Sequence, residues 1–167
     1  MTLGDLLVDA FTRIREGAEA AVRGLSPEQL AQRPTPNANS IGWLVWHLTR
    51  VQDDHLAAVA DHEQVWADGW HARFGLPFDV TDTGYGHTPD QVAQVRGLDA
   101  DQLVGYLAAV HAATVDYVRP LTPEDLGRVV DERWDPPVTL GVRLVSVVND
   151  DQQHVGQAAF LRGLLDG

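Results

Sequence analysis

The sequence contains no cysteine and no lysine. Without cysteine the chain forms no disulfide, no thiolate metal site and no cysteine nucleophile, so any thiol in its chemistry has to come from outside. No apolar run reaches the roughly 20 residues that a membrane-spanning helix needs. The N-terminus is acidic where a signal peptide is basic. We therefore expect a cytoplasmic protein that has no membrane partner.

Acidic residues outnumber basic ones by 24 to 12, which gives a net charge of −12 when histidine is neutral. A surface this acidic repels phosphate backbones, so the composition argues against nucleic acid as a partner. All the basic residues are arginine, and Ala, Val, Gly and Asp are abundant. This usage is typical of a GC-rich genome and describes the source rather than the fold.

The length of 167 residues and a hydrophobic content of 44% predict one domain over residues 1–167. Apolar residues recur at helical spacing in four segments. These run from about Leu3 to Gly24, from Ser40 to Asp61, from Asp99 or Asp101 to Val118, and from Thr139 to Leu165. Capped helix starts at Ser26, Thr88 and Thr122 predict short connecting helices. The fold class is therefore all-α, a four-helix bundle.

The connection over residues 65–87 is different, because aromatics, glycines and a proline alternate there without a period. We expect a long aromatic loop with one short helix around Val65 to Arg73. Loops this long in compact domains are usually functional or disordered, and the aromatic content favours function. Strand character is confined to the brief segment RVVDERW, residues 128–134.

The last predicted helix carries a line of polar side chains. At about 100° per residue, these lie within about 60° of one another: Arg143, Ser146, Asp150, His154 and Gln157. Apolar residues cover most other directions, so we predict a buried helix whose polar groups need partners. Those partners are either a core network, such as an Arg143–Asp150 ion pair, or a metal ion that Asp150 and His154 share one turn apart.

A metal would need a third ligand from another helix. His47 is the best candidate, since it stands mid-helix among apolar and aromatic residues; taken alone, it is equally a hydrogen-bonded core histidine. His111 allows the same two interpretations, of which we favour the structural one. Asp151 is three residues from His154, but it points about 100° away from Asp150, toward a different neighbour.

The motifs GWLVWHLTRVQDDH, DTGYGHTPDQV and QHVGQAAFLRGLL, which follow one another along nearly the whole chain, resemble the DinB-like superfamily. Within it, the sequence is most similar to the mycothiol S-transferase-like branch (DUF664) of actinobacteria. This resemblance implies a four-helix bundle in which a metal ion is held between the helices.

The superfamily site uses one histidine from the second bundle helix and two from the fourth, and here the first of those two is replaced by Asp150. The related mycothiol-dependent maleylpyruvate isomerases have a His, carboxylate, His set at the same spacing. The resemblance therefore implies His47, Asp150 and His154 as metal ligands. Three nitrogen and oxygen ligands leave an open position, as in catalytic sites. Zn²⁺ is the first expectation, and Ni²⁺, Fe²⁺ or Mn²⁺ also suit these ligands.

The resemblance also implies a reaction, in which a low-molecular-weight thiol, mycothiol above all, attacks a small electrophile. A divalent ion favours the thiolate of a thiol whose pKa is near 8.5. Asp54, about 20° from His47 on its helix, is a candidate acceptor for the thiol proton. Gln157 and Arg143 can orient the site or a bound carboxylate, or serve as surface and packing residues.

Aromatic residues of the long loop are candidates for substrate binding. The residues that can stack on a sugar or an apolar electrophile are Trp66, Trp70, Tyr85 and His87. Alternatively, Trp66 and Trp70 close the open end of the bundle.

Two other functions fit the same residues. One is a non-catalytic bundle that binds a metal or a small ligand, and the other is a metal-assisted hydrolase. The resemblance further implies a homodimer, since relatives of this type often pair through faces of the bundle.

Overall fold

The computed structural model describes residues 1–166. Its long helices are α1 (Leu3–Val22), α3 (Ile41–Ala60), α6 (Ala100–Val118) and α7 (Leu140–Asp166). Shorter elements connect them: α2 (Pro27–Ala31), the 3-10 turn η1 (Val65–Ala67), α4 (Trp70–Phe74), α5 (Pro89–Val92), the 3-10 turn η2 (Asp125–Gly127), and strands β1 (Val129–Asp131) and β2 (Val138–Thr139). The predicted all-α bundle with short connecting helices is confirmed, and each long helix ends within about two residues of the predicted bounds.

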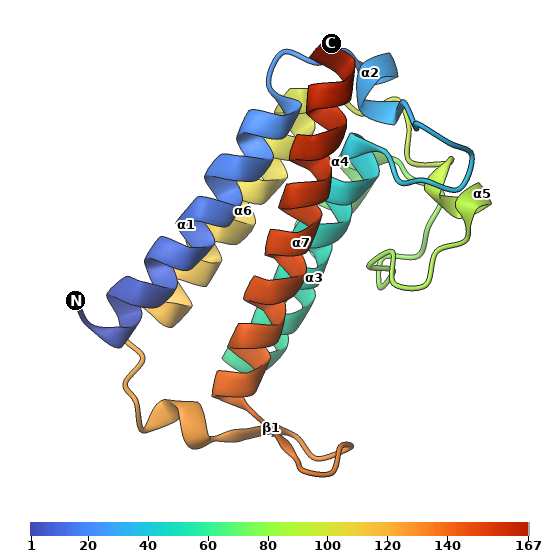
Figure 1. Ribbon diagram of the computed structural model, residues 1–167. Coiled ribbons are helices and arrows are strands. Elements are labelled where there is room, and N and C mark those ends of the chain that lie inside the picture. The colour runs from blue at the N-terminus through green and yellow to red at the C-terminus, as the bar shows by residue number, and fades with distance from the viewer. Residues whose placement is uncertain (167) are drawn as a thin grey trace.

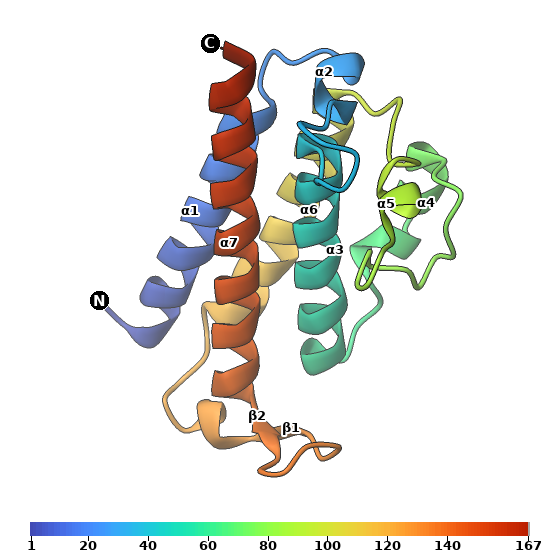
Figure 2. The ribbon, with the colours of Figure 1, turned by 45° about the vertical axis from the view of Figure 1, so that its right-hand side comes forward.

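Helices α1 and α7 run in one direction along the bundle, and α3 and α6 run in the other (Figure 1; Figure 2). Helix α7 packs between α1 and α3, and α6 packs on their other side. The predicted N-caps hold at Ser26 and Thr88, whose side chains accept hydrogen bonds from backbone N–H groups in the first helical turn. The cap predicted at Thr122 is wrong, because the 3-10 turn η2 starts only at Asp125 and has no side-chain cap. The two helices that carry the metal-ligand candidates, α3 and α7, are therefore direct neighbours.

The long connection between α3 and α6 is tied to the bundle by a buried ionic cluster. The guanidinium of Arg50, which is fully buried, donates to the backbone oxygens of Asp82 and Val80. Asp53 accepts hydrogen bonds from the backbone N–H groups of Val65 and Trp66, at 2.9 and 2.8 Å. Both ends of the aromatic loop are thus fixed to one face of α3.

Helix α7 is less buried than its apolar sequence predicts. Its exposed positions include Val142 (54%), Val145 (69%), Phe160 (68%) and Leu164 (55%). The prediction of a helix buried on nearly all sides is wrong, because α7 packs along α1 and α3 and its outer face remains uncovered in the chain. None of the described helices is long and apolar enough to cross a membrane.

His111 lies between α6 and α1, where its ring is 3.2 Å from the hydroxyl of Thr12. Burial lowers the pKa of His111, so the folded chain binds this proton less readily than the unfolded chain does. His111 therefore contributes to the free energy of unfolding above its ordinary pKa of about 6.5. This contribution is lost as the pH falls below that value.

We expect His111→Gln to have a shallower loss of unfolding free energy between pH 7 and pH 5 than the unaltered chain. One proton accounts for at most about 1.4 kcal/mol per pH unit. Urea unfolding at several pH values measures this slope. Identical slopes in both proteins would show that His111 does not titrate on folding.

Candidate metal centre and its cavity

Three side chains from α3 and α7 converge at mid-bundle. His47, Asp150 and His154 each offer one ligand atom, and these atoms lie within 4.8 Å of one another. The ring centroids of His47 and His154 are 4.8 Å apart, and Nε2 of His154 is 3.6 Å from Oδ2 of Asp150. The helical pair on α7 and the histidine on α3 therefore face one point, as the sequence predicts.

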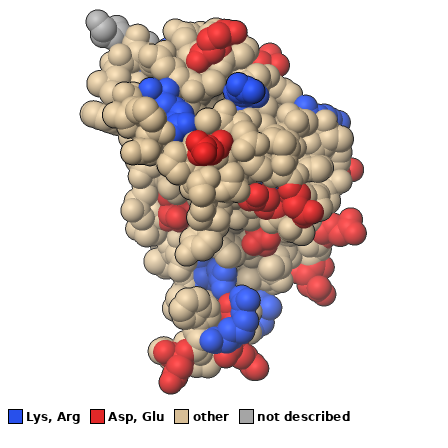
Figure 3. All heavy atoms as spheres, turned by 90° about the vertical axis from the view of Figure 1, so that its right-hand side faces the viewer, with Lys and Arg blue, Asp and Glu red and all other residues tan. Residues whose placement is uncertain are grey.

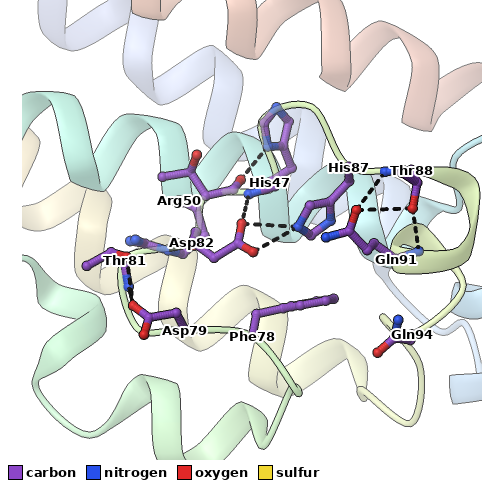
Figure 4. Close-up of polar contacts among 12 residues, drawn as sticks. His47, Arg50, Phe78, Asp79, Thr81, Asp82, His87, Thr88, Gln91 and Gln94 are labelled. Atoms are coloured by element: carbon purple, nitrogen blue, oxygen red, sulfur yellow. Dashed lines mark hydrogen bonds and ion pairs between the residues drawn. The ribbon is translucent and has the colours of Figure 1, made fainter.

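The imidazole of His47 is oriented by the aromatic loop (Figure 4). Its Nδ1 is 2.5 Å from the backbone oxygen of Thr83. Because a carbonyl oxygen only accepts, Nδ1 carries the proton and Nε2 keeps a free lone pair, the arrangement that metal-binding histidines commonly use. Gly84, with φ +86°, permits this approach, since a Cβ there would lie 2.9 Å from Nδ1 of His47.

The imidazole of His154 is oriented in a similar way from its own helix. Its Nδ1 is 3.2 Å from Oε1 of Gln157, one turn along α7. This amide oxygen accepts the Nδ1 proton and leaves Nε2 free toward Asp150. Trp43 stacks on His47 at 4.5 Å and meets His154 edge-on at 6.2 Å, which packs both rings in place.

The two neighbouring carboxylates of α7 have different surroundings. Oδ2 of Asp150 is buried in the cluster and has no hydrogen-bond partner. Asp151 is fully buried away from the cluster, also without a partner, and burial raises the pKa of its carboxyl well above the usual value. Asp150, and not Asp151, is therefore the carboxylate that stands with the two histidines.

These residues fit a divalent ion. An unpartnered carboxylate oxygen and two imidazole lone pairs converge, and burial lowers the pKa of His47 and so favours the neutral form that binds metals. All three donors are nitrogen or oxygen, a set that suits zinc and other first-row ions.

The cluster opens onto a cavity of about 560 Å³. His47 and Asp150 line it together with the loop residues Thr83 and Tyr85. The β1–β2 hairpin supplies Trp134 and a cluster of charged side chains. A volume of this size accommodates a small molecule beside the candidate metal ligands.

The charged cluster joins the hairpin to both α3 and α7. Nη2 of Arg143 lies 3.2 Å from Oδ2 of Asp131, and its Nη1 lies 2.7 Å from Nδ1 of His55. Arg143 therefore pairs with Asp131, so the predicted Arg143–Asp150 ion pair is wrong. The physical reason is that the hairpin, which sequence periodicity does not place, brings a closer carboxylate.

The other predicted site residues lie in three kinds of place. Asp54, Tyr85 and Arg143 line the cavity. Gln157 is exposed and contacts His154, outside the cavity lining. Trp70 and His87, which were predicted to bind substrate, lie outside the cavity lining and pack against other parts of the chain.

Neither Trp70 nor His87 is among the cavity-lining residues. The ring of Trp70 packs 5.6 Å from that of Tyr106 on α6, and so closes the bundle rather than the cavity. The side chain of His87 is 3% exposed, accepts a hydrogen bond from Trp43 and lies 3.0 Å from a carboxylate oxygen of Asp82 (Figure 4). These contacts shape the loop that carries Thr83.

Sequence patterns predict no role for four of the cavity residues: His55, Asp131, Arg133 and Trp134. Three of them belong to the hairpin, which sequence periodicity marks only as a brief strand and a loop. An isolated tryptophan beside an arginine in a Pro-containing loop, RWDPP, was the available signal.

The fold and this site define a four-helix bundle with a candidate metal centre made by two antiparallel helices and a substrate-sized cavity beside it. The sequence model of the mycothiol-S-transferase family matches residues 6–167, and the chain belongs to that family. A crystal structure of a conserved protein from Enterococcus faecalis has 33% sequence identity and a TM-score of 0.88, over 97% of this chain and 96% of that one. No curated protein matches the chain.

Proposed function

We propose that the protein is a metal-dependent S-transferase that joins a low-molecular-weight thiol to a small electrophile. The observation that carries this proposal is the convergence of His47, Asp150 and His154 at the edge of a cavity, in a chain that belongs to the mycothiol-S-transferase family. The chain has no cysteine, so the sulfur nucleophile is a cosubstrate. Mycothiol is the thiol that the family name favours.

The proposed residues for the metal are His47, Asp150 and His154, with Zn²⁺ as the first choice and Ni²⁺, Fe²⁺ or Mn²⁺ as alternatives. A bound divalent ion would lower the pKa of a thiol and so supply thiolate at neutral pH. Thr83 and Gln157 hold the two imidazoles in the tautomer that leaves Nε2 available.

Asp54 is the proposed acceptor of the thiol proton. Its side chain is 38% exposed, lines the cavity and is held by a 2.7 Å hydrogen bond from Gln64. In the proposed reaction the S–H bond breaks, its proton goes to Asp54 and a C–S bond forms on the electrophile. The displaced electron pair leaves with the leaving group, or with the adjacent carbon when the electrophile is a conjugated double bond.

The test is thiol consumption with a chromogenic electrophile, 1-chloro-2,4-dinitrobenzene. We expect the zinc-loaded protein to conjugate mycothiol, and to conjugate bacillithiol and glutathione more slowly. Asp54→Asn should lower the rate by about 10²-fold or more at unchanged zinc content, because general-base catalysis contributes about that much. Ala57→Ser, a change on the same helix outside the cavity lining, is the matched control.

Zinc-loaded protein that conjugates none of the three thiols would overturn the proposed transferase. Bound zinc without conjugation would favour a ligand-binding bundle. Release of chloride from the electrophile without any thiol would favour the metal-assisted hydrolase.

A further inference from the structure

Two arginines of the cavity wall share one carboxylate. Asp131 is 6% exposed and accepts four hydrogen bonds, three from Arg133 (2.8–3.0 Å) and one from Arg143 (3.2 Å). A carboxylate has about four acceptor positions, so that of Asp131 is saturated. The Arg133 guanidinium holds the pKa of Asp131 well below its usual range, so this carboxylate stays ionised.

Around Asp131 the arginines outnumber the carboxylates, whereas the other two carboxylates of the cavity wall, Asp54 and Asp150, come from α3 and α7. Burial and the neighbouring Arg143 lower the pKa of His55, which therefore stays neutral and accepts the hydrogen bond from Arg143. Two guanidinium groups thus meet one carboxylate, in a chain whose net charge is −12. The space-filling view shows basic side chains gathered near the hairpin end of a face that carries many acids (Figure 3).

The two guanidinium groups differ in how exposed they are and in how many partners hold them. The side chain of Arg143 is 17% exposed and is fixed by His55 and Asp131, whereas that of Arg133 is 85% exposed. Arg133 uses Nε and Nη2 on Asp131, which leaves Nη1 directed away from that pair. A guanidinium held in this way can bind a second carboxylate at small cost in conformational entropy.

An exposed indole stands next to this charge. Trp134 is 65% exposed and lines the same cavity, and its chain neighbour is Arg133. The cavity wall also includes four aliphatic residues: Val51, Val138, Val142 and Val147. A large flat apolar surface beside two guanidinium groups suits a ligand that is flat at one end and anionic at the other.

We propose that this part of the cavity binds the electrophile, and that the electrophile is a flat, conjugated or aromatic carboxylate. Its carboxylate would bind Arg133 and Arg143, and its plane would rest on Trp134. That this ligand acts as the electrophile rests on the proposed transferase function. Its binding to the subsite requires neither a thiol nor turnover. The same guanidinium groups can also bind a carboxylate carried by the thiol, so the experiment separates the two sources.

The probes are trans-cinnamate and cinnamamide, which share one shape and differ in charge. We expect zinc-loaded protein without thiol to bind cinnamate at least about tenfold more tightly than cinnamamide, as ligand-observed NMR titrations would measure. Arg133→Gln should weaken cinnamate about five- to tenfold and leave cinnamamide unchanged. Arg133→Lys should recover part of the loss, and Trp134→Ala should weaken both probes. Thermal melts confirm that each variant is folded.

Two results would overturn the subsite. One is equal affinity of the two probes for the unaltered protein. The other is cinnamate binding that persists in Arg133→Gln but disappears when zinc is removed, since the metal would then hold the carboxylate. Competition by a carboxylate-bearing thiol, glutathione, without any effect of Trp134→Ala on cinnamate would assign the arginines to the thiol instead. Since these titrations involve no turnover, an inactive transferase leaves them interpretable.

Discussion

Asp150→Ala is expected to lower zinc affinity by at least about 100-fold, because it removes one of three converging donors. Loss of a residue that only orients a ligand already costs about 10- to 100-fold. The unaltered chain should bind one zinc per chain and gain about 2.7 kcal/mol of stability at a metal concentration 100 times the dissociation constant. Asp150→Ala should lose that gain. Calorimetric titration and melts with and without zinc measure both quantities.

Asp151→Asn is the matched control for this prediction. Asp151 follows Asp150 in the same turn of α7 but is buried away from the cluster, and burial raises the pKa of its carboxyl. Asparagine has nearly the same shape and no charge, so zinc affinity should stay within about twofold. Zinc binding that survives in Asp150→Ala and fails in Asp151→Asn would reverse the assignment.

Asp150→His extends the test to the three-histidine pattern of the superfamily. An imidazole at this position should retain zinc, because His47 and His154 keep their orienting contacts with Thr83 and Gln157. If Asp150→His binds no zinc, the cluster depends on a carboxylate at this position, and this one substitution does not convert it to the three-histidine pattern.

Sequence periodicity was sufficient to predict the helices that carry the candidate metal ligands and the side of α7 on which two of them lie. The one-turn spacing of Asp150 and His154 put both on one side of α7, and the position of His47 in an apolar helix set it apart from the other histidines. The family resemblance then predicted that the ligands on α3 and α7 form one site. Periodicity could not predict how far α7 is buried. An apolar outer face gives the same sequence pattern whether or not another surface covers it.

The surroundings of the cluster could not be predicted for a different reason. Thr83 contacts His47 through a backbone oxygen, which any residue could offer, so its side-chain identity carries no signal. Arg133 and Trp134 reach the cavity only because β1 pairs with β2 and turns the intervening loop back over α7. The decisive information is the path of two irregular connections, which local patterns leave undetermined.

Asp53→Ala is expected to lower the free energy of unfolding by about 3–5 kcal/mol, the usual cost of removing one partner of a buried ion pair. Asp53 is 2% exposed, 3.5 Å from the fully buried guanidinium of Arg50, and accepts a 2.7 Å hydrogen bond from Tyr106. The substitution also removes the acceptor for two backbone N–H groups of η1. Chemical denaturation measures the loss.

The adjacent carboxylate supplies the control. Asp54 is 38% exposed, and its side chain accepts a hydrogen bond from the side chain of Gln64. Asp54→Ala should therefore lower the free energy of unfolding by less than about 1 kcal/mol. Equal losses at both positions would show that the Arg50–Asp53 pair does not hold the loop. If the pair does hold it, Asp53→Ala should also weaken zinc binding, because Arg50 fixes the Asp82 backbone next to Thr83, whose oxygen orients His47. The stability of the loop and the affinity of the metal centre would then change together, while Asp54→Ala would alter neither.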